Sequence, residues 1–403
     1  MPINPDANLQ LAQRVRCFVE QHILPHELVL GACDSAAGAL AATLQEQAKA
    51  AGVFGNFYPH ADGRRPLTLR EYLPIAAEEG RSEFAPAILG GDASLDAYML
   101  SRHANAELRE RYLLPLLRGE QVPCYAMSEP DSIGSIPATL TSRAQWQGDH
   151  WTLNARKWFI CRAGRADFAT VIARTADGPL QQSLSMLLVA SDSPGFEWVR
   201  PLALLGRQQG QGELLFKDVR VEPEHVLGEA GQGIALMQRR LGLGRLLRAA
   251  HWLGLAQRCF DDLCARVHSP RGELARLADK QLVRARVYRV FRDIAAARGL
   301  LEDAADKFDC GQANAIEVNL AKLAASEALS TAVDSAVQIM GAEGLSDLSP
   351  LSGIYRCARS THILDGTDDA LISNLGRDLL SATAPGRVFD CRSPSLNLAK
   401  VAP

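Results

Sequence analysis

The stretch Tyr125-Ala126-Met127-Ser128-Glu129-Pro130, followed by Gly134-Ser135, lies where the pattern of the sequence changes. Before it, from residue 8 to about residue 123, apolar residues recur at helical spacing. After it, as far as Gly233, short β-prone runs such as 185–189 and 216–221 are separated by Gly, Asp and Pro. The stretch therefore marks the passage from a helical domain to a β domain.

Long helices return after Gly233, and one of them carries an apolar stripe that repeats in steps of four and three. Its members are Ile316, Leu320, Leu323, Val333, Val337 and Met340. Such a stripe needs partner helices, and long helices usually pack as an antiparallel bundle. We expect an N-terminal α-helical domain over 1–124, a middle β-barrel or β-sandwich domain over 125–232, a C-terminal four-helix bundle over 233–383, and an irregular tail over 384–403.

The composition excludes several classes of function. The formal net charge of −3 leaves no basic stripe, so no nucleic-acid partner is expected. The nine cysteines form no C-x-x-C pair, which argues against a metal site or a disulfide framework and favours the reducing cytoplasm. No apolar stretch approaches the roughly 18 residues that a membrane span needs. We expect a cytoplasmic protein with no membrane segment and no metal.

Three stretches, in this order, resemble the acyl-CoA dehydrogenase family, and together they cover the chain from Gly52 to Leu380. The first is the Tyr125–Pro130 motif with Gly134-Ser135, which is similar to the segment that lines the flavin in that family. The second runs from Leu204-Leu205-Gly206 through 216–221 to Gly233. The third comprises Val337-Gln338-Ile339-Met340-Gly341, then Tyr355-Arg356, and then Ile363-Leu364-Asp365-Gly366-Thr367.

The resemblance implies an FAD-dependent enzyme that forms a double bond next to the carbonyl of an acyl thioester. Asp365 stands where the family has its catalytic base, usually Glu, and one branch of the family carries Asp-Gly there. A base that is too short by about 1 Å loses ~10²-fold in rate unless the backbone compensates. The alternative reading makes Asp365 a helix N-cap ahead of Asp368-Asp369. Some relatives place the base at the position of Gly244, which cannot serve.

The resemblance also assigns the remaining site residues. Phe159 and Cys161 fall where relatives usually have Trp and a hydroxyl residue, and Cys is a poor hydrogen-bond donor. The arginine that relatives direct at the flavin diphosphate is lost, because the equivalent stretch begins at His268 and carries only a displaced Arg271. The expected cofactor-binding residues are Tyr125, Met127, Ser128, Phe159, Cys161, Gln338, Gly341 and Thr367, and the expected substrate-binding residues are Ser135, Arg245 and Gly366.

Three functions remain open on this sequence. The first is dehydrogenation of an acyl-CoA or an acyl-carrier-protein thioester, with an electron-transferring flavoprotein or a similar acceptor. The second is a flavin monooxygenase on the same fold, which needs no carboxylate base and is disfavoured by the retained Asp-Gly-Thr. The third is a non-catalytic, flavin-poor scaffold member. Because Gln338 is expected to complete the flavin site of a second subunit, we predict a homodimer or homotetramer.

Overall fold

The N-terminal domain is helical in the computed structural model, which describes residues 5–59, 65–134 and 136–382. Local signals fix the starts of its helices: Asp34 caps α3, and Thr68 with Glu71 forms a capping box on α4. The helices are α1 Pro5–Phe18, α2 Glu27–Leu30, α3 Ser35–Ala50, α4 Leu69–Glu79, α5 Ala85–Ile88, α6 Ser94–His103, α7 Ala106–Leu108 and α8 Leu114–Leu117, with single turns η1 Val19–Ile23, η2 Leu24–His26, η3 Gly91–Ala93 and η4 Arg109–Leu113.

The middle domain is one seven-stranded sheet in the order β1-β4-β2-β3-β7-β6, with β5 paired to β4. Its strands are β1 Pro123–Ala126, β2 Arg143–Trp146, β3 Trp151–Cys161, β4 Phe168–Arg174, β5 Leu184–Ala190, β6 Phe196–Leu204 and β7 Arg207–Val221, joined in part by η5 Pro137–Thr139, η6 Ala163–Arg165 and α9 Leu180–Ser183. β4 and β5 are buried along almost their whole length, whereas β6 is largely exposed. The buried strands form the core of this domain, and the hairpin of β6 and β7 reaches towards the helices, where Arg207 pairs with Glu83.

The C-terminal domain is built on three long helices. They are α10 Gly233–Val267, α12 Gln281–Asp309 and α13 Ala315–Met340, followed by α14 Ala342–Leu345, α15 Leu351–Thr361 and α16 Asp368–Ala382; η7 Pro223–His225, α11 Pro270–Leu274 and η8 Leu277–Asp279 are short. Asn314 and Glu317 form a capping box that starts α13. α10 also packs closely on α4, and a Cβ on Gly254 would lie 1.9 Å from the carbonyl oxygen of Ala77, so glycine is required there.

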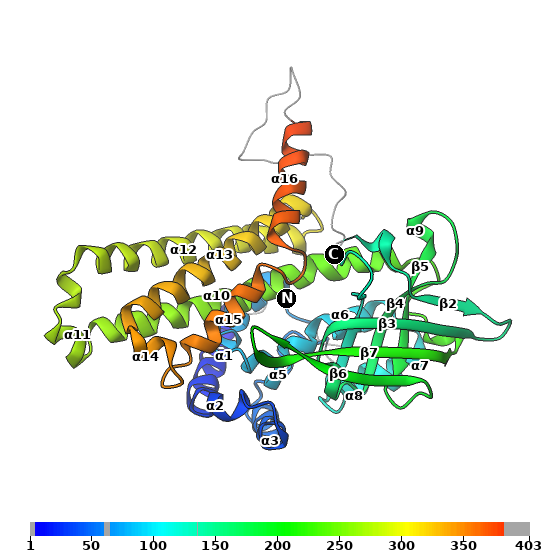
Figure 1. Cartoon of the computed structure of the whole chain (residues 1–403), viewed down its shortest axis with the longest axis horizontal. Helices are drawn as coiled ribbons and strands as arrows, with labels where there is room; N and C mark the ends of the chain where they lie inside the picture. Colours follow the sequence, from blue (N-terminus) through cyan, green and yellow to red (C-terminus); the bar gives the residue numbers. More distant parts are fainter. Residues whose placement is uncertain (1–4, 60–64, 135, 383–403) are drawn as a thin grey trace.

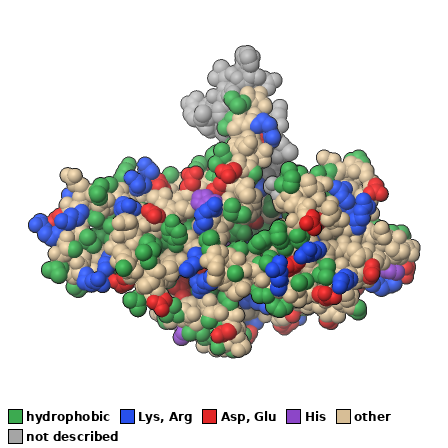
Figure 2. All heavy atoms as spheres, in the orientation of Figure 1, with side chains coloured by type: hydrophobic (Ala, Val, Ile, Leu, Met, Phe, Trp, Pro, Cys, Tyr) green, Lys and Arg blue, Asp and Glu red, His purple; other side chains and the backbone are tan. Residues whose placement is uncertain are grey.

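The arrangement of the three parts confirms the predicted fold. Figure 1 shows the sheet at one end of the molecule and α11 and α14 at the other, with α10 running between them. Figure 2 shows hydrophobic side chains gathered where the bundle meets the sheet domain. The expected tail over 384–403 lies outside the described residues. Within the described ranges, no helix combines the length and the apolar character needed to cross a bilayer.

Candidate active site

The turn between α15 and α16 holds Asp365 in an unusual backbone conformation. Asp365 has φ +56° and Gly366 has φ +100°, so two consecutive residues lie in the region that favours glycine, and aspartate tolerates it better than most side chains. The first helical residue of α16 is Asp368, and the hydroxyl of Thr367 accepts a hydrogen bond from the Ala370 N–H at 3.4 Å. Thr367, and not Asp365, therefore caps α16.

Side chains from α10 and α13 hold the Asp365-Gly366 turn by hydrogen bonds to its carbonyl groups. Arg245 donates from Nε to the carbonyl oxygen of Asp365 at 2.9 Å, and from Nη1 to Oδ1 of Asn319 at 2.9 Å. Lys322, which is fully buried, donates from Nζ to the carbonyl oxygen of Gly366 at 3.1 Å and pairs with Asp368. The turn is thus fixed through its two carbonyl groups, and its strained conformation is maintained by buried charges.

This clamp leaves the N–H side of the turn free. Among the described residues, no acceptor takes a hydrogen bond from the backbone N–H of Asp365 or of Gly366. A partly buried N–H without an acceptor is uncommon and marks a place where a ligand oxygen can bind. Arg245 was expected to contact substrate, but within this chain its guanidinium holds the backbone of Asp365.

The carboxylate of Asp365 has a partner that the sequence interpretation missed. Nε of Arg248 lies 2.5 Å from Oδ2 of Asp365, and the carboxylate raises the pKa of this guanidinium. The side chain of Asp365 is 18% exposed and that of Arg248 is 39% exposed, so a small molecule can reach both. Arg248 follows Arg245 by three residues on the same helical face, a spacing that would have revealed it.

A second buried charge cluster lies beside the first. The carboxylate of Asp96 receives Arg162 at 2.8 Å and Arg240 at 2.8 Å. Burial alone would raise the pKa of Asp96, but the two guanidiniums lower it. The ring of Tyr125 lies over Arg240, with 3.8 Å between the guanidinium carbon and the ring centre. Tyr125 therefore sits between strand β1 and helix α10, and its hydroxyl is buried without a partner among the described residues.

The residues expected to face a flavin ring meet at the ends of β1 and β3. The Trp158 N–H donates to the carbonyl oxygen of Ser128 at 3.0 Å, which joins the two segments. Phe159 has φ +51° and is 45% exposed, so a strained backbone holds a large aromatic ring outwards. Cys161 accepts a long hydrogen bond from Gln211, at 3.7 Å. A flat aromatic ligand would cover Phe159 and relieve its exposure.

A buried ion pair holds the Ser128 loop from behind. Nζ of Lys157 lies 2.8 Å from the carboxylate of Glu129 and 2.9 Å from the carbonyl oxygen of Met127. Burial lowers the pKa of Lys157 to about 8, while Glu129, although buried, has its pKa lowered to about 2 by that lysine and by donors from Thr141 and Ser142. Glu129 of the Ser-Glu-Pro motif is therefore a structural residue.

The two stretches expected to hold a diphosphate meet at the far end of the bundle. Arg266 and Arg271 both pair with Glu343, at 3.2 and 3.0 Å, just after exposed Gln338 and Gly341. This end of the molecule is opposite the sheet (Figure 1), so one chain does not bring Gln338 and Gly341 next to Ser128 and Phe159. Exposed His268 lies nearby in sequence, and Arg266 is a cation that the sequence interpretation overlooked.

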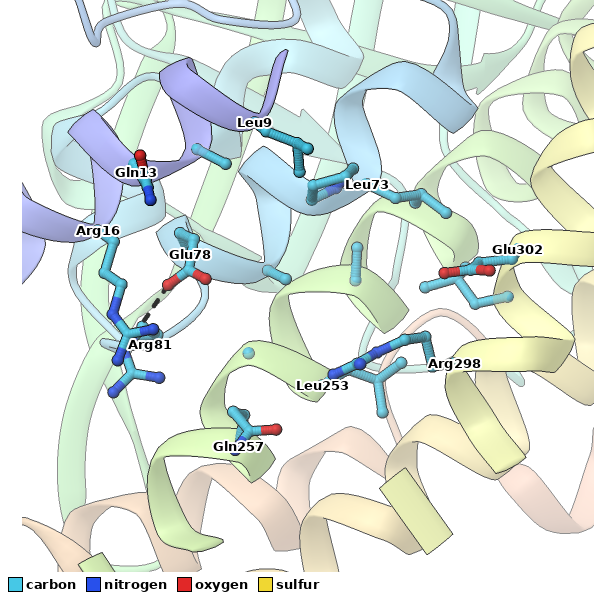
Figure 3. Close-up of a pocket in the computed structure, with 16 residues that line it drawn as sticks. Leu9, Gln13, Arg16, Leu73, Glu78, Arg81, Leu253, Gln257, Arg298 and Glu302 are labelled. Carbon is cyan, nitrogen blue, oxygen red and sulfur yellow. Dashed lines mark ion pairs between the residues drawn. The ribbon is translucent and has the colours of Figure 1, made fainter. Parts of the chain in front are cut away.

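A cavity of about 470 Å³ lies on another side of α10. Figure 3 shows that its lining comes from α1, α4, α10 and α12, with Leu9, Leu73 and Leu253 turned inwards and Arg16, Glu78 and Arg298 around them. None of the expected site residues lines it. Ser135, the remaining expected residue, lies outside the described residues.

Family models match the three domains in order: the acyl-CoA dehydrogenase N-terminal domain over 5–120, the middle domain over 124–219 and the C-terminal domain over 231–380. The probable acyl-CoA dehydrogenase FadE2 of Mycobacterium tuberculosis is 31% identical over 91% of this chain and 94% of its own length. This chain belongs to the acyl-CoA dehydrogenase family.

Two further relatives show how far the similarity extends. Acyl-CoA dehydrogenase family member 11 of Pongo abelii is 31% identical over 89% of this chain but only 48% of its own length, so the chain spans about half of that relative. A solved structure of a putative acyl-CoA dehydrogenase from Mycobacterium abscessus superimposes with a TM-score of 0.81 at 27% identity, covering 93% of this chain and 98% of its own. The recognised family and its fold are thus confirmed.

Proposed function

We propose that this acyl-CoA dehydrogenase family member removes the α-proton and the β-hydride from an acyl thioester, with Asp365 as the base. One observation carries the proposal: the strained turn presents a carboxylate and two backbone N–H groups without acceptors, while half-buried Arg245 and buried Lys322 hold its carbonyl groups. A carboxylate that takes the α-proton and N–H groups that hold the enolate-like oxygen are what this reaction needs from the polypeptide.

The carboxylate of Asp365 has a cation beside it. Nε of Arg248 lies 2.5 Å from Oδ2 of Asp365, and this contact positions the carboxylate. The α-proton passes to Oδ1 or Oδ2, and the N–H of Asp365 stabilises the negative charge that forms on the thioester oxygen. Arg245 prevents the turn from moving as charge develops, because it is bonded to both Asp365 and Asn319.

The cofactor is FAD, as in the rest of the family. Exposed Phe159 and the Ser128 loop fit one face and one edge of a flavin ring, with Tyr125, Met127 and Cys161 close by. When bound, FAD supplies the acceptor for the β-hydride. Thr367, next to the base, keeps its hydroxyl proton available while its oxygen accepts from Ala370. Ser135 remains a predicted contact to the acyl carrier.

A second copy of the chain completes the cofactor site in this proposal. Gln338, Gly341 and Arg271 lie at the end of the bundle opposite the sheet, which supports a contact with the flavin of a partner subunit. Large apolar side chains remain exposed along α12, including Tyr288 and Phe291 at 65% and 62%. Burying such a face favours a homodimer or homotetramer. The substrate is a thioester of coenzyme A or of a carrier protein, and an electron-transferring flavoprotein reoxidises the enzyme.

The two other readings of the sequence are less well supported by this geometry. A monooxygenase needs neither the carboxylate of Asp365 nor the two unused N–H groups of its turn. A scaffold member has no use for a strained turn held by buried charges, since such strain costs about 1–3 kcal/mol per residue. Functional sites are where such strain is usually kept, so the dehydrogenase is the better account.

Asp365→Asn tests the proposal, because the amide keeps the size of the side chain and the backbone N–H but removes the base. The purified variant should remain yellow and still bind a thioester, while anaerobic flavin reduction slows by ~10²-fold or more. Reduction at the parental rate would exclude Asp365 as the base. Rapid oxygen consumption by the reduced parent would favour the monooxygenase instead.

A further inference from the structure

The walls of the site around Asp365 carry more positive charge than a neutral acyl chain requires. Asp365 faces two guanidiniums, those of Arg245 and Arg248, and Asp96 faces two more. The charge of Asp96 acts on Arg248, so the two clusters share one electrostatic environment. Four guanidiniums thus contact Asp365 and Asp96, and exposed Asp92 is a further acid whose charge acts on Arg248.

Three of these four guanidiniums donate their hydrogen bonds to acceptors within the protein. Arg245 holds Asp365 and Asn319. Arg162 donates to Asp96 and to the carbonyl oxygen of Asp92, and Arg240 donates to Asp96 beneath the ring of Tyr125. Each of them is fixed by hydrogen bonds within the fold, so none is free to turn towards a ligand.

Arg248 is different, because only its Nε is engaged. Nε contacts Oδ2 of Asp365 at 2.5 Å, whereas Nη1 and Nη2 donate to no acceptor in the part of the chain that the structure describes. The side chain is nevertheless 39% exposed, and its one ion pair among the described residues is with Asp365. Two parallel N–H donors of one guanidinium match the two oxygens of a carboxylate or a phosphate-like group.

We infer that Arg248 binds an anionic group on the acyl chain, so that the substrate is a short acyl thioester with a carboxylate or a phosphate-like group a few bonds beyond the α-carbon. This inference rests on the proposed function, since it uses Asp365 as the group that meets the α-carbon. The contact between Arg248 and Asp365 limits how far the anion can lie from the carboxylate of Asp365. That separation is about the width of one guanidinium group plus the length of one hydrogen bond. A long neutral chain would leave the free donors of Arg248 buried without partners, which is costly.

A matched pair of substrates tests the inference on the FAD-loaded enzyme. Glutaryl-CoA ends in a carboxylate, and its amide, glutaramoyl-CoA, has the same shape without the charge. The parent should prefer the acid by about 100-fold in kcat/KM, the scale for a desolvated charge pair. 4-Phosphonobutyryl-CoA tests a phosphate-like group in place of the carboxylate. If the enzyme prefers it to glutaryl-CoA, the natural substrate carries a phosphate-like group.

Arg248→Gln removes the charge and should lower the preference for acid over amide by about 100-fold, whereas Arg248→Lys should retain part of it. Arg118→Gln, which removes an exposed arginine paired only with Glu120, should leave the preference unchanged. If Arg248→Gln slowed both substrates equally, Arg248 would act only on Asp365 and the inference would be wrong. A parent that favours the amide would also overturn it, even if the variants failed to fold.

The inference and the proposed function fail in different ways. If glutaramoyl-CoA and glutaryl-CoA bleach the flavin equally well, dehydrogenation is supported and the anion site at Arg248 is excluded. If no thioester bleaches the flavin, although each perturbs its absorbance on binding, the proposed function itself falls. In that case, tighter binding of the acid than of the amide would still support the anion site.

Discussion

Lys322 donates a hydrogen bond from its fully buried Nζ to the carbonyl oxygen of Gly366, 3.1 Å away. The same nitrogen pairs with Asp368, which in turn contacts His362 at 2.6 Å and Ser326 at 3.0 Å. A buried network next to the turn thus sets the position of Asp365, the proposed base. The contribution of this network to stability can be measured separately from its effect on the reaction.

Lys322→Met should destabilise the protein by about 3–5 kcal/mol, because it leaves the buried carboxylate of Asp368 without its cation. Urea unfolding of the purified variant measures this loss. Lys217→Met is the control: the side chain of Lys217 is 63% exposed and lies 3.8 Å from Glu197, so its removal should cost less than about 1 kcal/mol. Equal losses in the two variants would show that the network under Gly366 contributes little.

Arg245→Met should lower the rate of flavin reduction by about 10²-fold with FAD still bound, because the turn loses its hydrogen bond to the carbonyl oxygen of Asp365. Stopped-flow reduction by a thioester gives the rate. Arg245 acts through Asp365, so the double variant Arg245→Met/Asp365→Asn should be no slower than Asp365→Asn alone. Additive losses would instead indicate that Arg245 contacts the substrate independently.

The ion pair of Glu129 and Lys157 predicts a loss of stability in acid. The pKa of Glu129 is lowered from its ordinary value of 4.5 to about 2, so the folded protein binds this proton less readily than the unfolded chain does. The stabilisation is fully present above pH 4.5 and is lost as the pH falls towards 2. The difference in the free energy of unfolding between the parent and Glu129→Gln should therefore shrink over this window. A difference that does not depend on pH would contradict the assignment.

Glu343 pairs with Arg266 and Arg271, the two arginines closest to the proposed position of the FAD diphosphate of a partner subunit. Glu343→Gln should release Arg266 and Arg271 and lower the Kd for FAD by about 10-fold, since each guanidinium then has free donors for phosphate. Titration of apoprotein with FAD, followed by flavin fluorescence, measures the Kd. Glu273→Gln on α11, an exposed position, is the control. An unchanged Kd would place the diphosphate elsewhere.

The order of the domains could be predicted because it depends on local patterns. Apolar residues at helical spacing and short β-prone runs appear in any window of the sequence, and the Tyr125–Pro130 motif marks the change between them. Asp365 could be singled out as a candidate base because it lies in a motif with Gly366 and Thr367, and its role stays a prediction. These features need no knowledge of what is distant in sequence but close in space.

The environment of Asp365 could not be predicted in the same way. Arg248 lies 117 positions before Asp365, and Lys322 lies 44 positions before Gly366, so only the packing of α10 and α13 brings them to the turn. Asp96 comes from a different domain and receives Arg162 and Arg240 from two others. From sequence alone, a single charged residue in a helix is predicted to be exposed, because its spatial neighbours are not known.

Helix α10 has 35 residues without a break, which corresponds to a rod of about 50 Å. Its middle carries Arg245 and Arg248 to the base, and its last turn carries Arg266 to the proposed diphosphate position of the neighbouring subunit. In the proposed dimer, each rod is therefore shared between two catalytic centres about 30 Å apart along its length. Helix α10 would then couple two events: binding of the acyl chain in one subunit and binding of FAD in the other.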